Sequence, residues 1–461
     1  MQSTIKNMMP LNKILVKFLV LSLLFLSVSL TTVNAQEVID YKKAVNTAFL
    51  NSSLVTTVEN NIEIQNYNIR IAKGNLLPDL NLSAGWSRNL SDNKGGFLIQ
   101  NGVPIAVSST SARNNYNAGL SANYTIFNGF VNNREVDLQE ENQQFNLTNL
   151  EKQKESLIIA VTNNYIDILK KGKIIIANQD NLAVSQAQLS SIREYFNVGR
   201  KVIGDVYKQE VLVSQNDLKL EQSVNDLQKT KVDLLLTMNV DPTKEYTVNE
   251  NDFNINLTDA EIQQIVNSYQ NVNVLVEKAK NNRFEYKNAM QSISISEINY
   301  DIAEKTFLFP TISAFGNYNY SGDAPGNITN NRVINFGINL SYSIFQGWNL
   351  DSRRQQADIS VKQNRQNLLL LENQFKSDIK KAKYDLETTY KQYVILNTSL
   401  QSALQDRTLS EESYRLGLNT LLDVQTATTN YNNIVISRIT ALYDLLRAKK
   451  QLDYLTGEIK Y

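Results

Sequence analysis

The chain has 461 residues, of which 46 are basic and 46 acidic, and it contains neither cysteine nor histidine. The absence of these two residues excludes disulfide bonds, the usual zinc and haem ligands, and Ser-His or Cys-His nucleophile pairs. Zero net charge argues against a nucleic-acid-binding face, which normally shows a basic excess. We therefore expect no cofactor, no metal and no nucleic-acid partner, and an enzyme would have to rely on carboxylates or lysines alone.

Residues 1–35 have the pattern of a secretory signal peptide. Lysines without any acidic residue precede an apolar stretch at 18–30, and a Val-Asn-Ala sequence ends at Ala35, which predicts cleavage after that residue. A membrane anchor is the alternative, but the stretch is shorter than the about 20 residues that span a bilayer. No later run is apolar enough for a transmembrane helix, so entry into a membrane would have to use strands.

The remainder of the chain is duplicated. The segment YTIFNGF at 124–130 recurs as YSIFQGW at 342–348, 218 residues later, and the same offset relates Gly199 to Gly417. A fixed offset of this kind indicates two copies of one structural unit. The chain is expected to divide into a first repeat at 36–240, an inter-repeat segment at 241–280 and a second repeat at 281–461.

Each repeat is expected to begin with a helix and continue into strands. The helical patterns at about 55–73 and 284–306 stop before Pro78 and Pro310, because a residue that precedes proline is pushed toward extended geometry. Beyond each proline, apolar residues alternate with polar ones, as in amphipathic strands. The sequence predicts one β-hairpin per repeat, at about 79–128 and about 311–346.

The two hairpins are expected to differ in their loops. In the first, strands at 80–88 and 118–127 would be joined by a long loop at 89–116 that is rich in Asn, Gly and Ser. In the second, a short turn would join a strand at 312–320 to a strand at 334–344 in which apolar and polar residues alternate strictly. The first copy therefore has the longer loop.

After each hairpin the apolar period becomes helical. Apolar residues fall on every seventh position from 161 to 196, and five of the six equivalent positions from 379 to 414 are apolar, which is the seam of a coiled coil. Gly129 and Gly199 are 70 residues apart, as are Gly347 and Gly417. At ~1.5 Å per residue each such helix could reach ~100 Å. Asn239 and Gly457 suit left-handed C-caps at the ends of the return helices. Long helices are expected at about 130–238 and 348–456, with breaks near 199–204 and 417–422.

Two hairpins supply four strands, and four amphipathic strands cannot close a membrane barrel, for which eight is the smallest known number. Closure would have to be shared between chains. Two chains would give eight strands and a filled interior, whereas three would give twelve strands and an open lumen.

This organisation resembles the TolC-like outer membrane efflux protein family. The resemblance covers nearly the whole mature chain, through the order, duplication and spacing of motifs that are individually weak. It rests on Leu77-Pro78 and Phe309-Pro310 before the hairpins, Ile-Phe-x-Gly ending at Gly129 and Gly347 after them, and Gly-x5-Asp-Val from Gly199 and from Gly417.

The resemblance implies an α+β membrane protein. Three copies would form a 12-stranded outer membrane barrel continued by a periplasmic α-helical barrel, with an equatorial belt built from 37–51 and the inter-repeat segment. Such a homotrimer is a passive exit duct for efflux or type I secretion and not an enzyme. Its implied partners are a periplasmic adaptor, an inner membrane transporter of RND, ABC or MFS type, and outer membrane lipid.

The resemblance also implies functional residues at the helical tip. Tyr414 would bond Asp205, and Asp423 would form a ring of carboxylates, while Thr426 and Asn419 stand where relatives often have aspartate and arginine. Helix capping is the other role for both aspartates, and on the residues alone it explains Asp205 better than a gate role does and Asp423 equally well. The expected tip and gate residues are Gly199, Asp205, Tyr414, Gly417, Asp423 and Thr426, and the expected strand–helix junctions are Pro78, Gly129, Pro310 and Gly347.

Two other classes are less well supported by the sequence. A secreted coiled-coil stalk or adhesin would explain the long helices, but it would not need four alternating strands between matching proline and glycine junctions. An exported hydrolase with paired carboxylates would need a compact α/β segment to hold them, and the sequence pattern has none.

Overall fold

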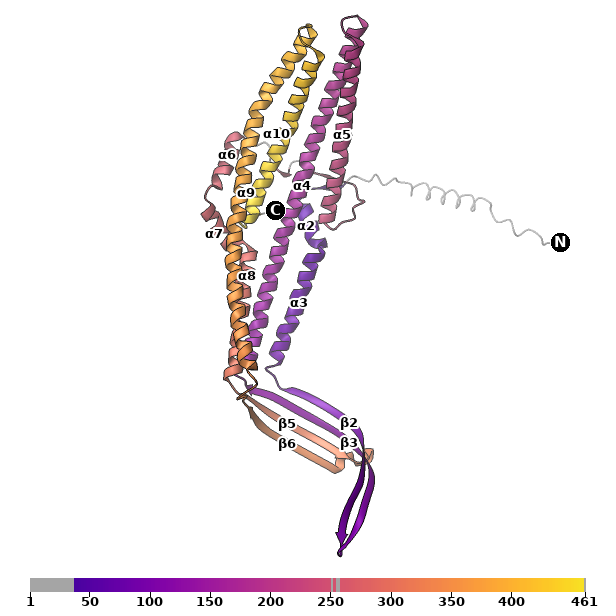
Figure 1. Ribbon diagram of the computed structural model, residues 1–461, viewed down its shortest axis with the longest axis vertical. Coiled ribbons are helices and arrows are strands. Elements are labelled where there is room, and N and C mark those ends of the chain that lie inside the picture. The colour runs from indigo at the N-terminus through magenta and orange to yellow at the C-terminus, as the bar shows by residue number, and fades with distance from the viewer. Residues whose placement is uncertain (1–36, 250–251, 254–257, 460–461) are drawn as a thin grey trace, which may run out of the picture.

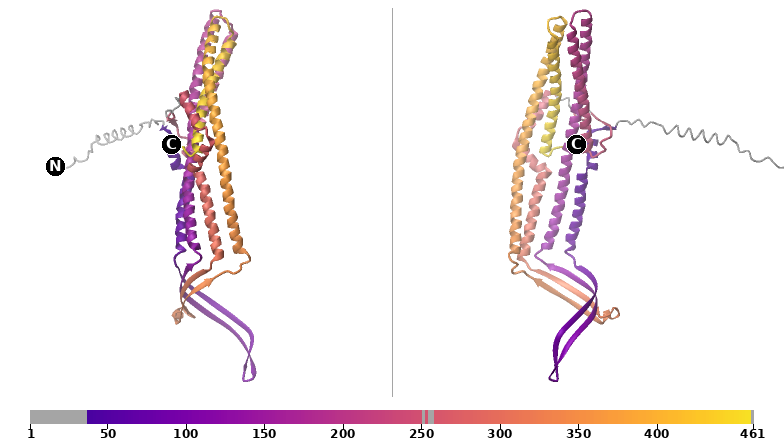
Figure 2. Two further views of the ribbon diagram at one scale, coloured as in Figure 1. Left: turned by 90° about the vertical axis from the view of Figure 1, so that its left-hand side faces the viewer. Right: turned by 45° about the vertical axis from the view of Figure 1, so that its right-hand side comes forward.

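The computed structural model describes residues 37–249, 252–253 and 258–459, so the expected signal peptide at 1–35 lies outside the described residues. The molecule is elongated, with a four-stranded sheet at one end and two helical hairpins at the other (Figure 1). Both repeats run side by side along the whole length, and both pairs of long helices turn at the same end (Figure 2).

The sheet is antiparallel and contains both hairpins. Its order is β2-β3-β5-β6, so the hairpin of one repeat pairs with that of the other through β3 and β5. Among the described residues, β2 and β6 each have one neighbouring strand and leave an open edge. The strands are β2 (Asp79–Gln100), β3 (Val103–Phe127), β5 (Thr311–Gly322) and β6 (Asn331–Ser341), with the 3-10 helix η2 (Pro325–Asn330) between the last two.

The prediction of a long loop at 89–116 is wrong. Strands β2 and β3 continue through it as one hairpin, with a bulge between Asn93 and Gly96. The hairpin closes at Asn101 and Gly102, whose φ angles of 55° and 81° are both left-handed, as a two-residue Asn-Gly hairpin turn requires. The pairing of β3 with β5 stops at Tyr116, so the outer part of this hairpin projects beyond the sheet, as Figure 1 shows.

The last expected strand is displaced by three residues, because β6 covers Asn331–Ser341 and not 334–344. Ser341 pairs with Thr311, the first residue of β5. The residue before it is Pro310, which has no N–H to donate to a ladder. Nothing on β5 therefore continues the pairing past Ser341.

The sheet has one apolar face and one polar face. In β6, Ile338 and Leu340 pair with Ala314 and Ile312, and side chains on one face of a sheet recur every second residue. The same face continues through β3 to β2, where Leu82 pairs with Leu120. The residues between them, such as Asn339, belong to the opposite face, which carries mostly Asn, Ser, Gly and Thr.

The long helices repeat the 218-residue offset at every boundary. Helices α4 (Val131–Asn197) and α9 (Asn349–Arg415) have 67 residues each, and α5 (Ile203–Thr237) and α10 (Leu421–Leu455) have 35 each. They lie in the order α5, α4, α10, α9 across the molecule (Figure 1). As expected for left-handed C-caps, φ is 50° at Asn239 and 70° at Gly457.

Shorter elements pack against the middle and the sheet end of these helices. Helices α3 and α8 pack beside α4 and α9 toward the sheet. Near mid-length, β1, α2 and β4 form one apolar core against α4, and α6 and α7 form a second core against α9 and α10. In the part of the chain that the structure describes, no helix combines the length and apolar character needed to cross a membrane. These elements are β1 (Glu37–Ile39), α2 (Tyr41–Asn51), α3 (Ser53–Gly74), β4 (Tyr246–Val248), α6 (Asp259–Ser268), α7 (Val272–Asn282) and α8 (Phe284–Leu308).

Candidate functional site: the helical tip and the strand–helix junctions

Two short turns form the tip of the molecule. Gly199 and Gly417 follow the ends of α4 and α9 with φ angles of 74° and 80°. At the first turn Arg200 N–H donates to the Tyr195 carbonyl at 2.8 Å. At the second, Leu418 N–H donates to the carbonyl five residues back, also at 2.8 Å. Both turns are thus Schellman motifs, in which a left-handed glycine lets the chain satisfy the last helical carbonyls and reverse.

Tyr414 joins the two hairpins at this tip. Its hydroxyl donates to Asp205 Oδ2 at 3.4 Å, and Lys201 Nζ lies 3.6 Å from the centre of its ring and donates to its carbonyl at 3.2 Å. Burial and the neighbouring Asp205 carboxylate raise the pKa of Tyr414 to about 12. The hydroxyl therefore keeps its proton, and so its role as donor, throughout the physiological pH range.

Apolar and amide contacts extend this junction along the helices. Tyr414 belongs to a buried cluster with Ile192, Val206, Leu421 and Val424. The cluster as a whole contains residues from all four long helices. Amide side chains add a second layer. Gln209 donates to the Ser185 carbonyl at 3.0 Å and accepts from Gln425 at 3.1 Å, and Gln188 donates to Glu411 at 2.9 Å.

The two tip aspartates have different local roles. Asp423 accepts from Thr420 N–H at 2.9 Å and from its hydroxyl at 2.7 Å, while Thr420 in turn caps α10. This is a capping box, and these hydrogen bonds lower the pKa of Asp423. Capping is wrong for Asp205, because the N-cap of α5 is Val202, without a side-chain bond. Thr426 donates to the Leu422 carbonyl of its own helix at 2.8 Å.

A cavity of about 340 Å³ lies beside Tyr414 at the tip. It opens between α4 on one side and α9 and α10 on the other, and it is partly apolar. The charged groups on its wall are Glu411 and Arg415.

The junctions between strands and helices are strained in the same way in both repeats. Gly129 and Gly347 have φ angles of 70° and 57°, and the next residues, Phe130 and Trp348, are also left-handed at 65° and 66°. A Cβ on Gly129 would lie 2.8 Å from Phe309, whereas one on Gly347 would meet open space. Left-handed aromatic residues are uncommon, and the sequence alone did not identify these two.

The prolines lie across the same junctions. Pro78 and Pro310 each stand immediately before the first residue of a strand, Asp79 in β2 and Thr311 in β5. The Phe309 ring packs edge-on against Phe127 at 6.0 Å. One aromatic layer therefore connects the end of β3 with the residue that precedes the second hairpin.

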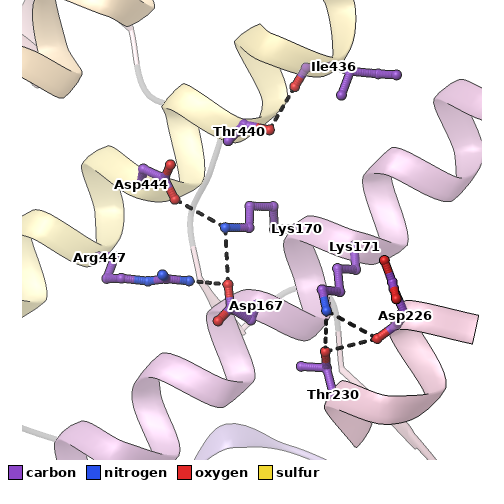
Figure 3. A network of polar contacts seen from close by, with 9 residues as sticks. All are labelled: Asp167, Lys170, Lys171, Asp226, Thr230, Ile436, Thr440, Asp444 and Arg447. Atoms are coloured by element: carbon purple, nitrogen blue, oxygen red, sulfur yellow. Dashed lines mark hydrogen bonds and ion pairs between the residues drawn. The ribbon is translucent and has the colours of Figure 1, made fainter. Parts of the chain in front are cut away.

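Charged residues that the sequence did not single out connect the two repeats near mid-length (Figure 3). Lys170 on α4 lies 3.1 Å from Asp167 of the same helix and 3.1 Å from Asp444 on α10. Arg447 on α10 bonds Asp167 in return. Their spacing of three residues on each helix was visible in the sequence, but the pairing arises only because α4 packs against α10.

The family model described as outer membrane efflux protein matches residues 44–240 and 275–458. A search of curated proteins found no match. Several solved structures share the fold at 15% identity. They include a membrane protein from Pseudomonas aeruginosa (TM-score 0.75, covering 92% of this chain and 91% of that one), the Campylobacter jejuni CmeC outer membrane channel (0.73, 91% and 85%) and the outer membrane protein VceC of Vibrio cholerae (0.73, 90% and 96%).

The family match covers both repeats and most of the chain, and the fold agrees with it over the same length. The sheet, the paired junctions and the helical tip are thus parts of one known architecture. The chain belongs to the outer membrane efflux protein family and is an outer membrane protein.

Proposed function

We propose that this protein is the exit duct of a tripartite efflux or type I secretion system. It would work as a homotrimer that passively conducts small molecules or polypeptides from an inner membrane transporter to the exterior. The observation that carries the proposal is the sheet, which has one apolar face across all four strands, one polar face and two open edges.

The sheet suits a membrane only as part of a larger ring. Unpaired backbone groups at an open edge are costly in lipid, so a spanning sheet has to close on itself. Three copies would supply twelve strands, enough to leave a lumen, with the edges β2 and β6 joined between copies. The apolar face would then contact lipid, and the Asn- and Ser-rich face would line the lumen.

The helices would continue this lumen on the periplasmic side. Helices of 67 residues reach ~100 Å, and their tips would meet a periplasmic adaptor and an inner membrane transporter of RND, ABC or MFS type. At the tip, Asp205, Tyr414 and Asp423 would control the narrowest part, with the two left-handed glycines shaping the turns. A coiled-coil stalk would need no sheet of this kind.

Topology and conductance together test the proposal. Epitope tags at Asn101 and near Asn327 should be reached by antibody on intact cells, because both lie at the hairpin ends far from the helical tip. A matched tag at Gly199 should be reached only after the outer membrane is permeabilised. The purified protein should run as a heat-sensitive trimer and give discrete conductance steps in planar bilayers. Surface labelling at Gly199, or a folded monomer without conductance, would refute the duct.

A further inference from the structure

The charged network between α4 and α10 holds the two repeats of one chain together. Asp167 and Lys170 on α4 face Asp444 and Arg447 on α10, so two carboxylates meet two cations (Figure 3). The four side chains are half-buried or more, with exposed fractions between 15% and 37%. Charges that are withdrawn from water in this way need partners.

The duplication assigns each of these residues a counterpart. Because every boundary of the four long helices repeats after 218 residues, α9 corresponds to α4 and α5 corresponds to α10. Helices α5 and α9 lie at opposite edges of the layer, so these two cannot form the corresponding contact within one chain (Figure 1). The counterparts are Asp385 and Thr388 on α9, and Asp226 and Lys229 on α5.

Differences in exposure show that the corresponding face of α5 is bare. The side chains of Asp226 and Lys229 are 59% and 71% exposed, whereas their counterparts Asp444 and Arg447, which α4 covers, are 37% and 34% exposed. Tyr443 on α10 is 2% exposed, but its counterpart on α5 is an exposed asparagine. On α9, Asp385 and Thr388 are exposed as well.

We infer that α9 of one copy packs against α5 of a second copy as α4 packs against α10, which places Asp385 opposite Lys229 of the second copy. The inference rests on the homo-oligomer of the proposed function and adds the residues of its interface. A contact of this kind joins two different faces, and repeating it gives a closed ring when the rotation between copies closes, as it does in a trimer related by a threefold axis. The internal contact supplies the model for its geometry.

The two contacts differ in charge. Lys170 has Thr388 as its counterpart, so the contact between copies would contain two carboxylates, Asp385 and Asp226, but one cation, Lys229. Asp226 would face a neutral hydroxyl where Asp444 faces an ammonium. The contact between subunits is therefore the weaker of the two at this level of the molecule.

Charge reversal tests the pairing in the purified full-length protein. Lys229→Glu should lower the temperature at which the trimer dissociates, and adding Asp385→Lys should restore most of the loss. The matched control is Lys219→Glu, which changes the same charge on α5 at an exposed position whose counterpart on α10, Ser437, is also exposed. Equal effects of Lys229→Glu and Lys219→Glu, or no rescue by Asp385→Lys, would overturn the pairing.

A gain of stability tests the missing cation. Thr388→Lys restores the counterpart of Lys170 and should raise the dissociation temperature, and Asp226→Asn in the same chain should cancel that gain, since contacting residues are not additive. No gain from Thr388→Lys, or a gain that survives Asp226→Asn, would contradict the geometry.

Crosslinking separates this inference from the proposed function. The chain has no cysteine, so Asp385→Cys with Lys229→Cys and a short flexible thiol crosslinker should give covalent dimers and trimers. The matched pair Asp167→Cys with Arg447→Cys should stay a single chain under the same conditions. A wild-type protein that forms no trimer would refute the duct and the interface together. A wild-type trimer in which the first pair links within one chain would refute the interface alone.

Discussion

The Tyr414 hydroxyl reaches the Asp205 carboxylate across 209 residues of sequence, and their oxygens lie 3.4 Å apart. This hydrogen bond joins the tips of the two helical hairpins. It is long for an O–H···O contact, which indicates a modest strength, but its phenol is held in place by the buried apolar cluster and by Lys201.

Removing the two partners of this bond should have unequal effects. Tyr414→Phe deletes a weak bond and should loosen the tip slightly, whereas Asp205→Ala leaves the hydroxyl without its acceptor, at a cost of about 1 to 3 kcal/mol. Single-channel recordings should show a small rise in conductance for the first variant and a larger one for the second. Tyr207→Phe, at an exposed position on the same turn of α5, is the control. Unchanged conductance in both variants would show that the hydrogen bond between Tyr414 and Asp205 does not hold the tip closed.

Two variants at the start of α10 should separate the effect of the Asp423 charge on ion selectivity from the effect of helix capping on stability. Asp423→Asn removes the carboxylate charge, whereas Thr420→Ala removes half of the capping box and keeps that charge. Carboxylates converging on a pore axis favour cations, so the first variant should lose most of the cation preference in reversal-potential measurements. The second should keep the preference and lose about 0.5 to 2 kcal/mol of stability. If Asp423→Asn keeps the same reversal potential, Asp423 is only a helix cap.

The two junction glycines allow the cost of left-handed backbone strain to be compared with the cost of a steric clash. Either Gly129→Ala or Gly347→Ala places a side chain in a left-handed conformation, which costs roughly 1 to 2 kcal/mol. Only at Gly129 would the new Cβ also meet Phe309, at 2.8 Å. Gly129→Ala should therefore lower the dissociation temperature of the trimer further than Gly347→Ala. Equal losses would mean that Phe309 moves away freely.

Neighbouring residues on β6 should respond in opposite ways. Ile338 lies on the apolar face and Asn339 on the polar face. Ile338→Arg should cost about 2 to 4 kcal/mol near the membrane midplane, whereas Asn339→Arg should be tolerated at the polar surface. Yield and heat stability of the trimer from outer membranes would measure both. Equal tolerance would show that the lipid and lumen faces are assigned wrongly.

Glu155 should make stability depend on pH. Burial raises its pKa to about 7, against the opposing charges of Arg283 and Lys287. Because the folded pKa lies above the ordinary value of 4.5, the protonated form favours folding, and that stability is lost as pH rises from about 4.5 to about 7. Glu155→Gln should therefore raise the thermal midpoint at pH 8 and match the wild type near pH 4.5. A gain of the same size at both pH values would exclude ionisation as its cause.

The sequence indicated the large-scale arrangement because that arrangement depends on periodicity. The seven-residue apolar pattern gave helices that begin two residues after Gly129 and Gly347. The alternation in β6 gave its two faces. These patterns arise from burial on one side of an element, which leaves a mark in the sequence.

The predictions from sequence were wrong where an element is not buried on one face alone. The outer part of the first hairpin projects beyond β5, and its stretch at 89–96 is rich in Asn, Ser, Asp and Gly without a regular apolar alternation. Of the strands that the structure describes, the two of this hairpin pair only with each other there, and the usable signal was the Asn-Gly turn at 101–102. The left-handed Phe130 depends on how distant segments meet, which a single sequence does not encode locally. The hydrogen bond between Tyr414 and Asp205 is equally long-range, but the family resemblance implied it, and the structure contains it.

The two helical hairpins have equal lengths, so their tips end at the same height along the molecule. Removing one heptad from both α4 and α5 near the tip would keep the apolar seam in phase and lower that tip by ~10 Å, while α9 and α10 kept their height. A ring of three such chains would end in an uneven rim, in which short and long helical hairpins alternate. Insertions and deletions in this protein are therefore compatible with a level rim only when both repeats change together.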